Sequence, residues 1–136
     1  RRRIPPMPKE SRPPMGFQQL IGLDIYERAD GVSRARIAVT PDHMNPHGVV
    51  HGGVLYAMAD TGMGAALYTR LDEDESCATI ELKMVYIAGV REGALECETR
   101  LISKGKRVAF LESEVRNGDR LVAKALGTFA IFPARG

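Results

Sequence analysis

The chain has 136 residues, of which 44% are hydrophobic and 26% are charged. This length suits one globular domain with its own core and is too short for two. No stretch approaches the ~20 consecutive apolar residues of a membrane-spanning helix, so the composition excludes a transmembrane protein. The formal net charge of +2 conceals a basic segment, since residues 1–14 hold five basic residues against one acidic residue. Because the rest of the chain is net acidic, we expect no basic face for nucleic acid.

The first 15 residues predict an Arg- and Pro-rich tail. Five of the eight prolines lie in this segment, which favours an extended or disordered chain outside the fold. It lacks the unbroken apolar run of a secretory signal, and we expect residues 16–136 to form the single domain. The two cysteines, Cys77 and Cys97, lack metal-knuckle spacing. They predict reduced thiols in a cytoplasmic protein.

From residue 16 onward the hydrophobic pattern predicts structured elements. In chain order these are a helical turn at 17–21, a strand from 23, a turn at 30–31, a strand at 32–40, a loop at 41–48, a helix within 54–71, and strands at 78–87, 94–103, 107–116 and 121–132. The strand at 94–103 alternates apolar and charged residues, so one face of the sheet is expected to be in water. The pattern predicts an α+β domain, with one antiparallel sheet whose apolar face is covered by one long helix.

The predicted helix is rich in small residues, namely Ala57, Ala59, Gly62, Gly64, Ala65 and Ala66. Glycine inside a helix costs about 1 kcal/mol relative to alanine, so a compensating interaction is expected. Small side chains allow close approach of backbones. We therefore expect this helix to be central, packed on the sheet and touched by a partner helix.

The segment from Asn45 to Asp60 contains Asn-Pro-x-Gly, then His-Gly-Gly at 51–53, then an acid on the helix. With the Thr-Ile-Glu-Leu strand at 79–82 and the terminal hairpins, it resembles the hotdog-fold acyl-CoA thioesterases, in particular the phenylacetate-degradation type. The resemblance extends from residue 16 to residue 132. It implies a hotdog fold, in which an antiparallel sheet wraps around one long central helix, and an acyl-CoA substrate.

Gly52 and Gly53 are expected to open the helix. The backbone N–H groups of a first helical turn lack partners and lie at the positive end of the helix dipole. They are suited to a carbonyl oxygen that gains negative charge. The alternative is that the two glycines only permit a tight turn.

Three further residues are candidates for catalysis. Asp60 lies in an apolar setting where an unpaired carboxylate is costly, and the resemblance makes it either the general base for water or a nucleophile that forms a mixed anhydride. By the same resemblance, the Asn45 amide orients the water or the thioester carbonyl. The Thr79 hydroxyl holds the water or the carboxylate. The alternatives are an acid that is solvated or paired for structure, an Asn-Pro turn and an ordinary strand threonine.

His43, His47 and His51 have a spacing that would form a metal face on a helix. Pro41, Pro46 and Gly48 forbid that helix, so no metal site is expected. We interpret His51 as a residue that fixes the loop, with a general base as the lesser alternative. Cys77 has no base near it in sequence and is expected to be a buried apolar residue rather than a nucleophile.

Coenzyme A carries phosphates and a long pantetheine arm, so a binding site needs an apolar tunnel with basic residues at its mouth. The candidates are Lys104, Lys106 and Arg107 at a predicted hairpin, and Arg91. Because charged hairpin tips are often only solvated, the alternative is a surface role. No cofactor is expected beyond coenzyme A as part of the substrate.

The leading hypothesis is hydrolysis of an acyl-CoA to free acid and CoA, with an aryl or medium-chain acyl group. The alternatives are a hotdog acyl-CoA hydratase or dehydratase and a non-catalytic acyl-CoA-binding module. Gly52 and Asp60 are eight residues apart, about 12 Å along one helix, too far to act on one carbonyl. We therefore predict an obligate dimer with composite sites, assembled further as a tetramer.

Overall fold

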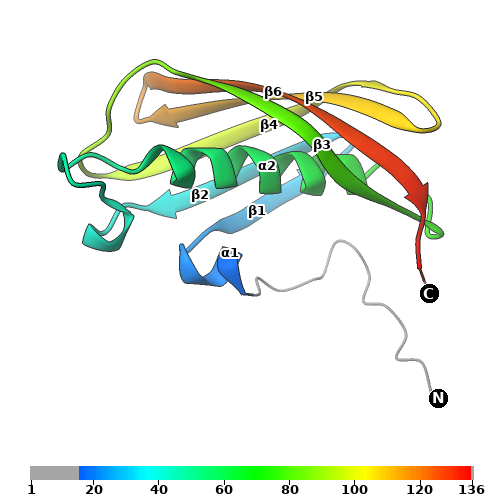
Figure 1. The fold of residues 1–136 in the computed structure, drawn as a ribbon, viewed down its shortest axis with the longest axis horizontal. Coiled ribbons are helices and arrows are strands. Elements are labelled where there is room, and N and C mark those ends of the chain that lie inside the picture. Colours follow the sequence, from blue (N-terminus) through cyan, green and yellow to red (C-terminus); the bar gives the residue numbers. More distant parts are fainter. Residues whose placement is uncertain (1–15, 136) are drawn as a thin grey trace.

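The computed structural model describes residues 16–135, so the predicted tail at 1–15 lies outside the described residues. The elements in chain order are α1 (Phe17–Leu20), β1 (Asp24–Ala29), β2 (Val32–Ala38), the 3-10 helix η2 (Pro41–His43), α2 (Gly52–Tyr68), β3 (Glu75–Tyr86), β4 (Ala94–Lys104), β5 (Val108–Asn117) and β6 (Arg120–Pro133). The strands form one antiparallel sheet in the order β1-β2-β4-β5-β6-β3. The helix α2 lies across one face of this sheet (Figure 1). The predicted α+β architecture is confirmed.

Turn chemistry explains the tight hairpins. Asp30 and Gly31 both have positive φ, at 50° and 79°, and they join β1 to β2 through the Ala29–Val32 pair. Positive φ at both central residues matches the right-handed twist of the two strands. In one of the predicted terminal hairpins, between the strands expected at 107–116 and 121–132, Gly118 has φ 63° and joins β5 to β6. These Asp-Gly and Gly-containing turns are local signals, and both predictions are confirmed.

Two element boundaries differ from the pattern-based prediction by three residues, and the others agree within two. β3 begins at Glu75, three residues before the predicted start, because Glu75 pairs with Pro133 of β6. The helix α2 ends at Tyr68 rather than near residue 71. The Thr69 hydroxyl donates to the Ala66 carbonyl at 2.7 Å and accepts from the Gly31 amide at 2.7 Å. Both boundaries therefore depend on contacts with distant parts of the chain.

Nine of the 17 residues of α2 are buried, six are half-buried, and only Gly53 and Tyr56 are exposed. A buried hydroxyl group from the sheet contacts its backbone directly, as Ser33 Oγ donates to the Gly62 carbonyl at 2.7 Å. A Cβ at position 62 would lie 2.9 Å from Thr99 Oγ1. The small residues of α2 thus allow the helix to lie directly on the sheet, as predicted.

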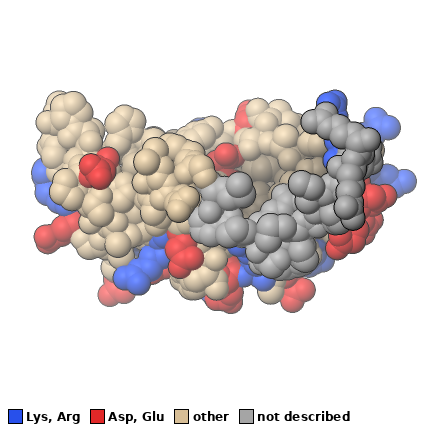
Figure 2. Space-filling view, turned by 90° about the horizontal axis from the view of Figure 1, so that it is seen from below, with Lys and Arg blue, Asp and Glu red and all other residues tan. Residues whose placement is uncertain are grey.

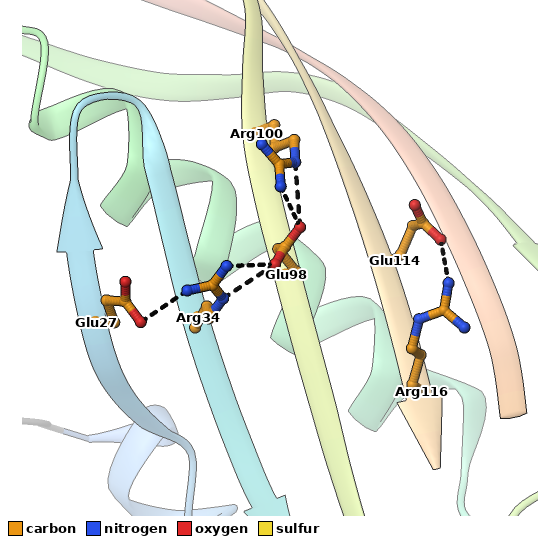
Figure 3. Close-up of polar contacts among 6 residues, drawn as sticks. All are labelled: Glu27, Arg34, Glu98, Arg100, Glu114 and Arg116. Carbon is orange, nitrogen blue, oxygen red and sulfur yellow. Dashed lines mark hydrogen bonds and ion pairs between the residues drawn. The ribbon is translucent and has the colours of Figure 1, made fainter. Parts of the chain in front are cut away.

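The opposite face of the sheet is polar over β1, β2, β4 and β5. Ion pairs join Arg34 to Glu27 at 2.9 Å, Arg34 to Glu98 at 2.8 Å and Arg100 to Glu98 at 2.8 Å (Figure 3). A separate pair on β5 joins Arg116 to Glu114 at 3.0 Å. The Arg34 guanidinium, and then Arg100, lower the pKa of the Glu98 carboxyl below its ordinary value. The expectation of one wet face is confirmed.

Seen from below the fold, uncharged residues cover much of the described surface, and both signs of charge are mixed around its margins (Figure 2). Within residues 16–135, no helix has the length and apolar character needed to cross a membrane.

Candidate active site

A tight loop precedes the start of α2. Met44 and Val50 form an isolated bridge, and the Asn45 amide N–H donates to the Val49 carbonyl at 2.8 Å. The side chain of Asn45 stabilises the same loop, since its Oδ1 accepts from the amides of His47 at 2.9 Å and Val49 at 3.3 Å. Its Nδ2 group makes no hydrogen bond within the described part of the chain. The Asn45 side-chain oxygen therefore stabilises a turn, as the alternative hypothesis expects, and its two Nδ2 hydrogens stay available to a ligand.

His43 anchors this loop to the beginning of the domain. The ring is 6% exposed. Its Nδ1 accepts from the Thr40 amide at 2.9 Å, and its Nε2 lies 2.8 Å from the Ile21 carbonyl. A ring nitrogen that accepts from a backbone N–H carries no proton, so the neutral tautomer with hydrogen on Nε2 satisfies both bonds. Sequence reasoning missed this role, because Ile21 is 22 residues away.

The first turn of α2 is capped by His51. The Gly53 amide donates to His51 Nδ1 at 2.8 Å, and the Val54 amide donates to the His51 carbonyl at 2.9 Å. The expectation of a free Gly53 N–H is therefore wrong, because this N–H donates to the capping side chain of His51. Among residues 16–135, the Gly52 N–H has no hydrogen-bond partner. It is thus a free backbone donor at the positive end of a 17-residue helix.

Asp60 lies two turns further along α2 and faces β3. The Thr79 hydroxyl donates to Asp60 Oδ1 at 2.6 Å, which is a short, charge-assisted hydrogen bond. The carboxylate is half-buried, and its Oδ2 has no hydrogen-bond partner in the described range. A half-buried carboxylate with one oxygen held and the other free has the arrangement of a general base or a nucleophile.

The predicted site residues form two groups within one chain. Because α2 is continuous from Gly52 to Tyr68, Asp60 is about 12 Å along the axis from Gly52. Asn45 and His51 lie with Gly52, and Thr79 lies with Asp60. One chain therefore carries the two halves of a possible site at separate positions.

A cavity of about 520 Å³ opens beside the N-terminus of α2. It is lined by Val49, Val50, His51, Gly52, Gly53, Leu55 and residues 86–90. Tyr86 was not among the sequence candidates. It comes from the end of β3, 34 residues beyond Gly52, and its hydroxyl donates to the Gly52 carbonyl at 2.8 Å. Partial burial, and then the neighbouring Tyr56, raise the pKa of the Tyr86 hydroxyl, so it remains a donor at neutral pH.

The basic candidates are divided between the two ends of the fold. Arg91 donates to the Gly48 carbonyl at 3.3 Å, beside the loop that precedes α2. Lys104, Lys106 and Arg107 lie at the β4–β5 hairpin. Of these, Lys106 and Arg107 line a separate groove with the acidic segment that follows α2. Within one chain these four cations do not surround one mouth.

The remaining candidates are thiols and histidines. Cys97 is buried, and desolvation raises the pKa of its thiol to about 11. Cys77 is half-buried rather than buried and packs against the apolar cluster under the second half of α2. His47 is exposed. In the part of the chain that the structure describes, no three His, Cys, Asp or Glu side chains are grouped as a metal site would require.

Comparison with known proteins places this geometry in a family. The family model of the thioesterase superfamily matches residues 47–124. A Pseudomonas aeruginosa protein, provisionally named as an esterase, is 34% identical over 85% of this chain and 95% of its own length. The 1,4-dihydroxy-2-naphthoyl-CoA hydrolase of Listeria monocytogenes is 25% identical over 74% of this chain and 82% of its own.

Among solved structures, a variant of the phenylacetic acid degradation protein PaaI of Thermus thermophilus superposes with a TM-score of 0.78 at 30% identity, covering 84% of this chain and 96% of that one. The fold and the acid-bearing central helix define a hotdog-fold protein. The chain belongs to the thioesterase superfamily.

Proposed function

We propose that the protein is an acyl-CoA thioesterase that hydrolyses its substrate to the free acid and CoA. The observation that carries the proposal is the Asp60 carboxylate, held by the Thr79 hydroxyl at 2.6 Å with its second oxygen free. Family membership and the free N–H of Gly52 support it. The names of two relatives, a naphthoyl-CoA hydrolase and a phenylacetic acid degradation protein, favour an aryl acyl group. A medium-chain acyl group is the alternative.

In the proposed reaction, water attacks the thioester carbonyl and Asp60 Oδ2 takes its proton. The carbonyl oxygen becomes an oxyanion that accepts a hydrogen bond from the Gly52 N–H. The C–S bond then breaks, and the thiolate of CoA takes the proton back. Asp60 could instead attack the carbonyl itself, and water would then hydrolyse the mixed anhydride. In both routes the Asn45 Nδ2 group orients the carbonyl or the water. No metal or redox cofactor takes part.

The separation of the two half-sites leads us to propose a dimer. Two copies of α2 packed antiparallel would place Gly52 and Asn45 of one chain opposite Asp60 and Thr79 of its partner. Position 56 is midway between 52 and 60, so Tyr56 would meet its own copy on the two-fold axis. Tyr56 is 39% exposed on a helix in which Gly53 is the other exposed residue, so its ring is accessible to a partner chain.

The free edge of β3 supports the same dimer. β3 is 12 residues long and, among residues 16–135, pairs only with β6 and lies at the end of the sheet. It carries exposed apolar residues, with Ile80 58% and Val85 52% exposed. A long, apolar, unprotected edge strand favours pairing with another chain. We extend the proposal to a tetramer, which light scattering would distinguish from a dimer as four rather than two chains of 14.9 kDa.

The antiparallel arrangement would also bring together the basic residues that are candidates for binding CoA. The C-terminal end of one α2 would approach the loop before the partner's α2. The hairpin bearing Lys104, Lys106 and Arg107 from one chain and Arg91 from the other would then lie at the same end of the dimer. We propose that these cations bind the phosphates of CoA.

A panel of acyl-CoA substrates with detection of released CoA tests the activity. Asp60→Asn should lower turnover by roughly 10²–10⁴ and leave binding of a non-hydrolysable thioester analogue nearly intact. Asp119→Asn, an exposed acid at the β5–β6 turn, is the control and should retain activity. Binding without hydrolysis in the wild type would favour the non-catalytic module. Hydration of an enoyl-CoA would favour the hydratase.

Two experiments test the composite site. When an Asp60→Asn chain is co-refolded with an Asn45→Ala chain, each heterodimer should recover about half the activity of the wild-type dimer. One of its two composite sites contains both substitutions, and the other contains neither. A short bifunctional thiol reagent should join Tyr56→Cys chains but not Tyr26→Cys chains, whose tyrosine is exposed on the opposite face of the sheet. Proven heterodimers as inactive as the parent variants would contradict the model.

A further inference from the structure

We infer that Tyr86 is a positioning and specificity residue, which holds the Gly52 peptide in place and forms the wall of the acyl pocket beside it. The inference rests on the proposed function and extends it to a residue that no motif indicates. Tyr86 is the last residue of β3, and 52% of its surface is exposed. Its hydroxyl nevertheless makes a 2.8 Å hydrogen bond to the Gly52 carbonyl.

The ring of Tyr86 explains why position 52 is glycine. Gly52 is absent from the residues with positive φ, so its backbone conformation is open to any residue. A Cβ at this position would, however, lie 3.1 Å from Cε1 and Cζ of Tyr86 and 3.2 Å from its hydroxyl oxygen. The aromatic ring occupies the space of a side chain at residue 52. A side chain at residue 52 would therefore require the Tyr86 ring to move by a few tenths of an ångström, so glycine at this position favours the close contact between the two residues.

Tyr86 completes the support of the first helical turn. The amides of Gly53 and Val54 are satisfied by His51, which fixes the turn from within the loop. The Tyr86 hydroxyl fixes the Gly52 carbonyl from the sheet. These contacts hold the residue whose N–H remains free, and a donor that is already oriented needs no reorganisation when charge develops on a bound carbonyl.

The same ring faces the cavity beside Gly52. Tyr86 lines that cavity of about 520 Å³ together with apolar residues such as Leu55 and Val90. An acyl group whose carbonyl lies at the Gly52 N–H would extend into this space and contact the ring. Removing the ring enlarges the pocket, whereas removing only the hydroxyl leaves its shape unchanged. The two contributions of Tyr86 are thus separable by substitution.

Tyr86→Phe tests positioning, with Tyr26→Phe as a matched control. Tyr26 is also 52% exposed and also donates a 2.8 Å hydrogen bond, to Glu96 on the opposite face. We expect Tyr86→Phe to lower kcat by roughly three- to tenfold, the range for one lost hydrogen bond, with KM within about twofold and acyl preference unchanged. Tyr26→Phe should leave both constants unchanged. A Tyr86→Phe variant with the kcat of the wild type would overturn the positioning role.

Tyr86→Ala tests whether the Tyr86 ring forms a wall of the acyl pocket. Its kcat/KM for a bulkier acyl group, relative to a smaller one, should rise by roughly tenfold. An unchanged preference would overturn the specificity role.

An activity-independent measurement separates this inference from the proposed reaction. In ¹⁵N-labelled protein, Tyr86→Phe should shift the amide resonances of Gly52 and Gly53, and Tyr26→Phe should not. If no acyl-CoA is hydrolysed by the wild type, the proposed function fails, while the resonances still report the contact. Unshifted Gly52 and Gly53 resonances in Tyr86→Phe would overturn the inference whatever the activity.

Discussion

Two glycines of α2, Gly62 and Gly64, provide a matched pair for testing how closely the helix packs on the sheet. Replacing either glycine with alanine gains about 1 kcal/mol of helix propensity. At position 64 the nearest atom that a new Cβ would meet is Phe129 Cε2 at 3.9 Å, an ordinary contact. Gly64→Ala should therefore be neutral or stabilising by up to about 1 kcal/mol.

At position 62 the same methyl group meets an immobile neighbour. The new Cβ would lie 2.9 Å from Thr99 Oγ1 and 3.4 Å from Ser33 Oγ. Thr99 is fully buried and hydrogen-bonded to Ser113 at 2.7 Å, so it cannot move away without breaking that bond. Overpacking of this kind costs about 1–3 kcal/mol. After the gain in propensity, Gly62→Ala should be destabilised by up to about 2 kcal/mol.

Urea unfolding followed by circular dichroism measures the difference. The two variants are compared at one protein concentration, because association shifts apparent stability. Gly64→Ala should unfold at higher urea than Gly62→Ala, with a gap of about 1–3 kcal/mol in the free energy of unfolding. Equal midpoints would refute the reasoning, since both substitutions change helix propensity equally and differ only in what the new methyl group meets.

Three further outcomes follow from the described contacts. Thr79→Val should lower turnover by roughly tenfold or more, because a hydrogen bond to a charged group is lost. Thr79→Ser keeps the hydroxyl and should retain turnover, so equal activity of the two variants would show that the hydroxyl is not used. In the native protein a thiol reagent should modify half-buried Cys77 faster than Cys97, because the raised pKa and the burial of Cys97 leave almost no thiolate at pH 8. Mass spectrometry of the labelled peptides measures the order of modification, and faster labelling of Cys97 would contradict the prediction. The pKa of Glu98 is lowered in the folded state, chiefly by Arg34, so its contribution to stability is present above the unfolded pKa and is lost as pH falls through the folded pKa. Glu98→Gln should therefore be less stable than the wild type near pH 7 and approach it once the pH has fallen below the folded-state pKa of Glu98. A pH-independent difference between their unfolding curves would argue against the ion pair.

Local sequence determined the elements and the motif. The tight turns at Asp30–Gly31 and at Gly118 require positive φ, which glycine and aspartate adopt within a few residues of chain. The beginning of α2 at Gly52 follows from a loop that ends in two glycines and an apolar run. The spacing from Gly52 to Asp60 also follows, because the rise of a continuous helix is constant. From these local features the α+β fold and the separation of Gly52 from Asp60 along one helix could be predicted.

Tertiary structure decided what meets across the sheet. The pairing of Thr79 with Asp60 and that of Tyr86 with Gly52 depend on the register of β3 beside β6 and on where α2 crosses the strands. A bulge between Thr79 and Glu81 shifts that register by one residue, and a shift of one residue turns a side chain to the other face. No periodicity within β3 encodes that shift, so only the assembled sheet brings Tyr86 over the first turn of α2.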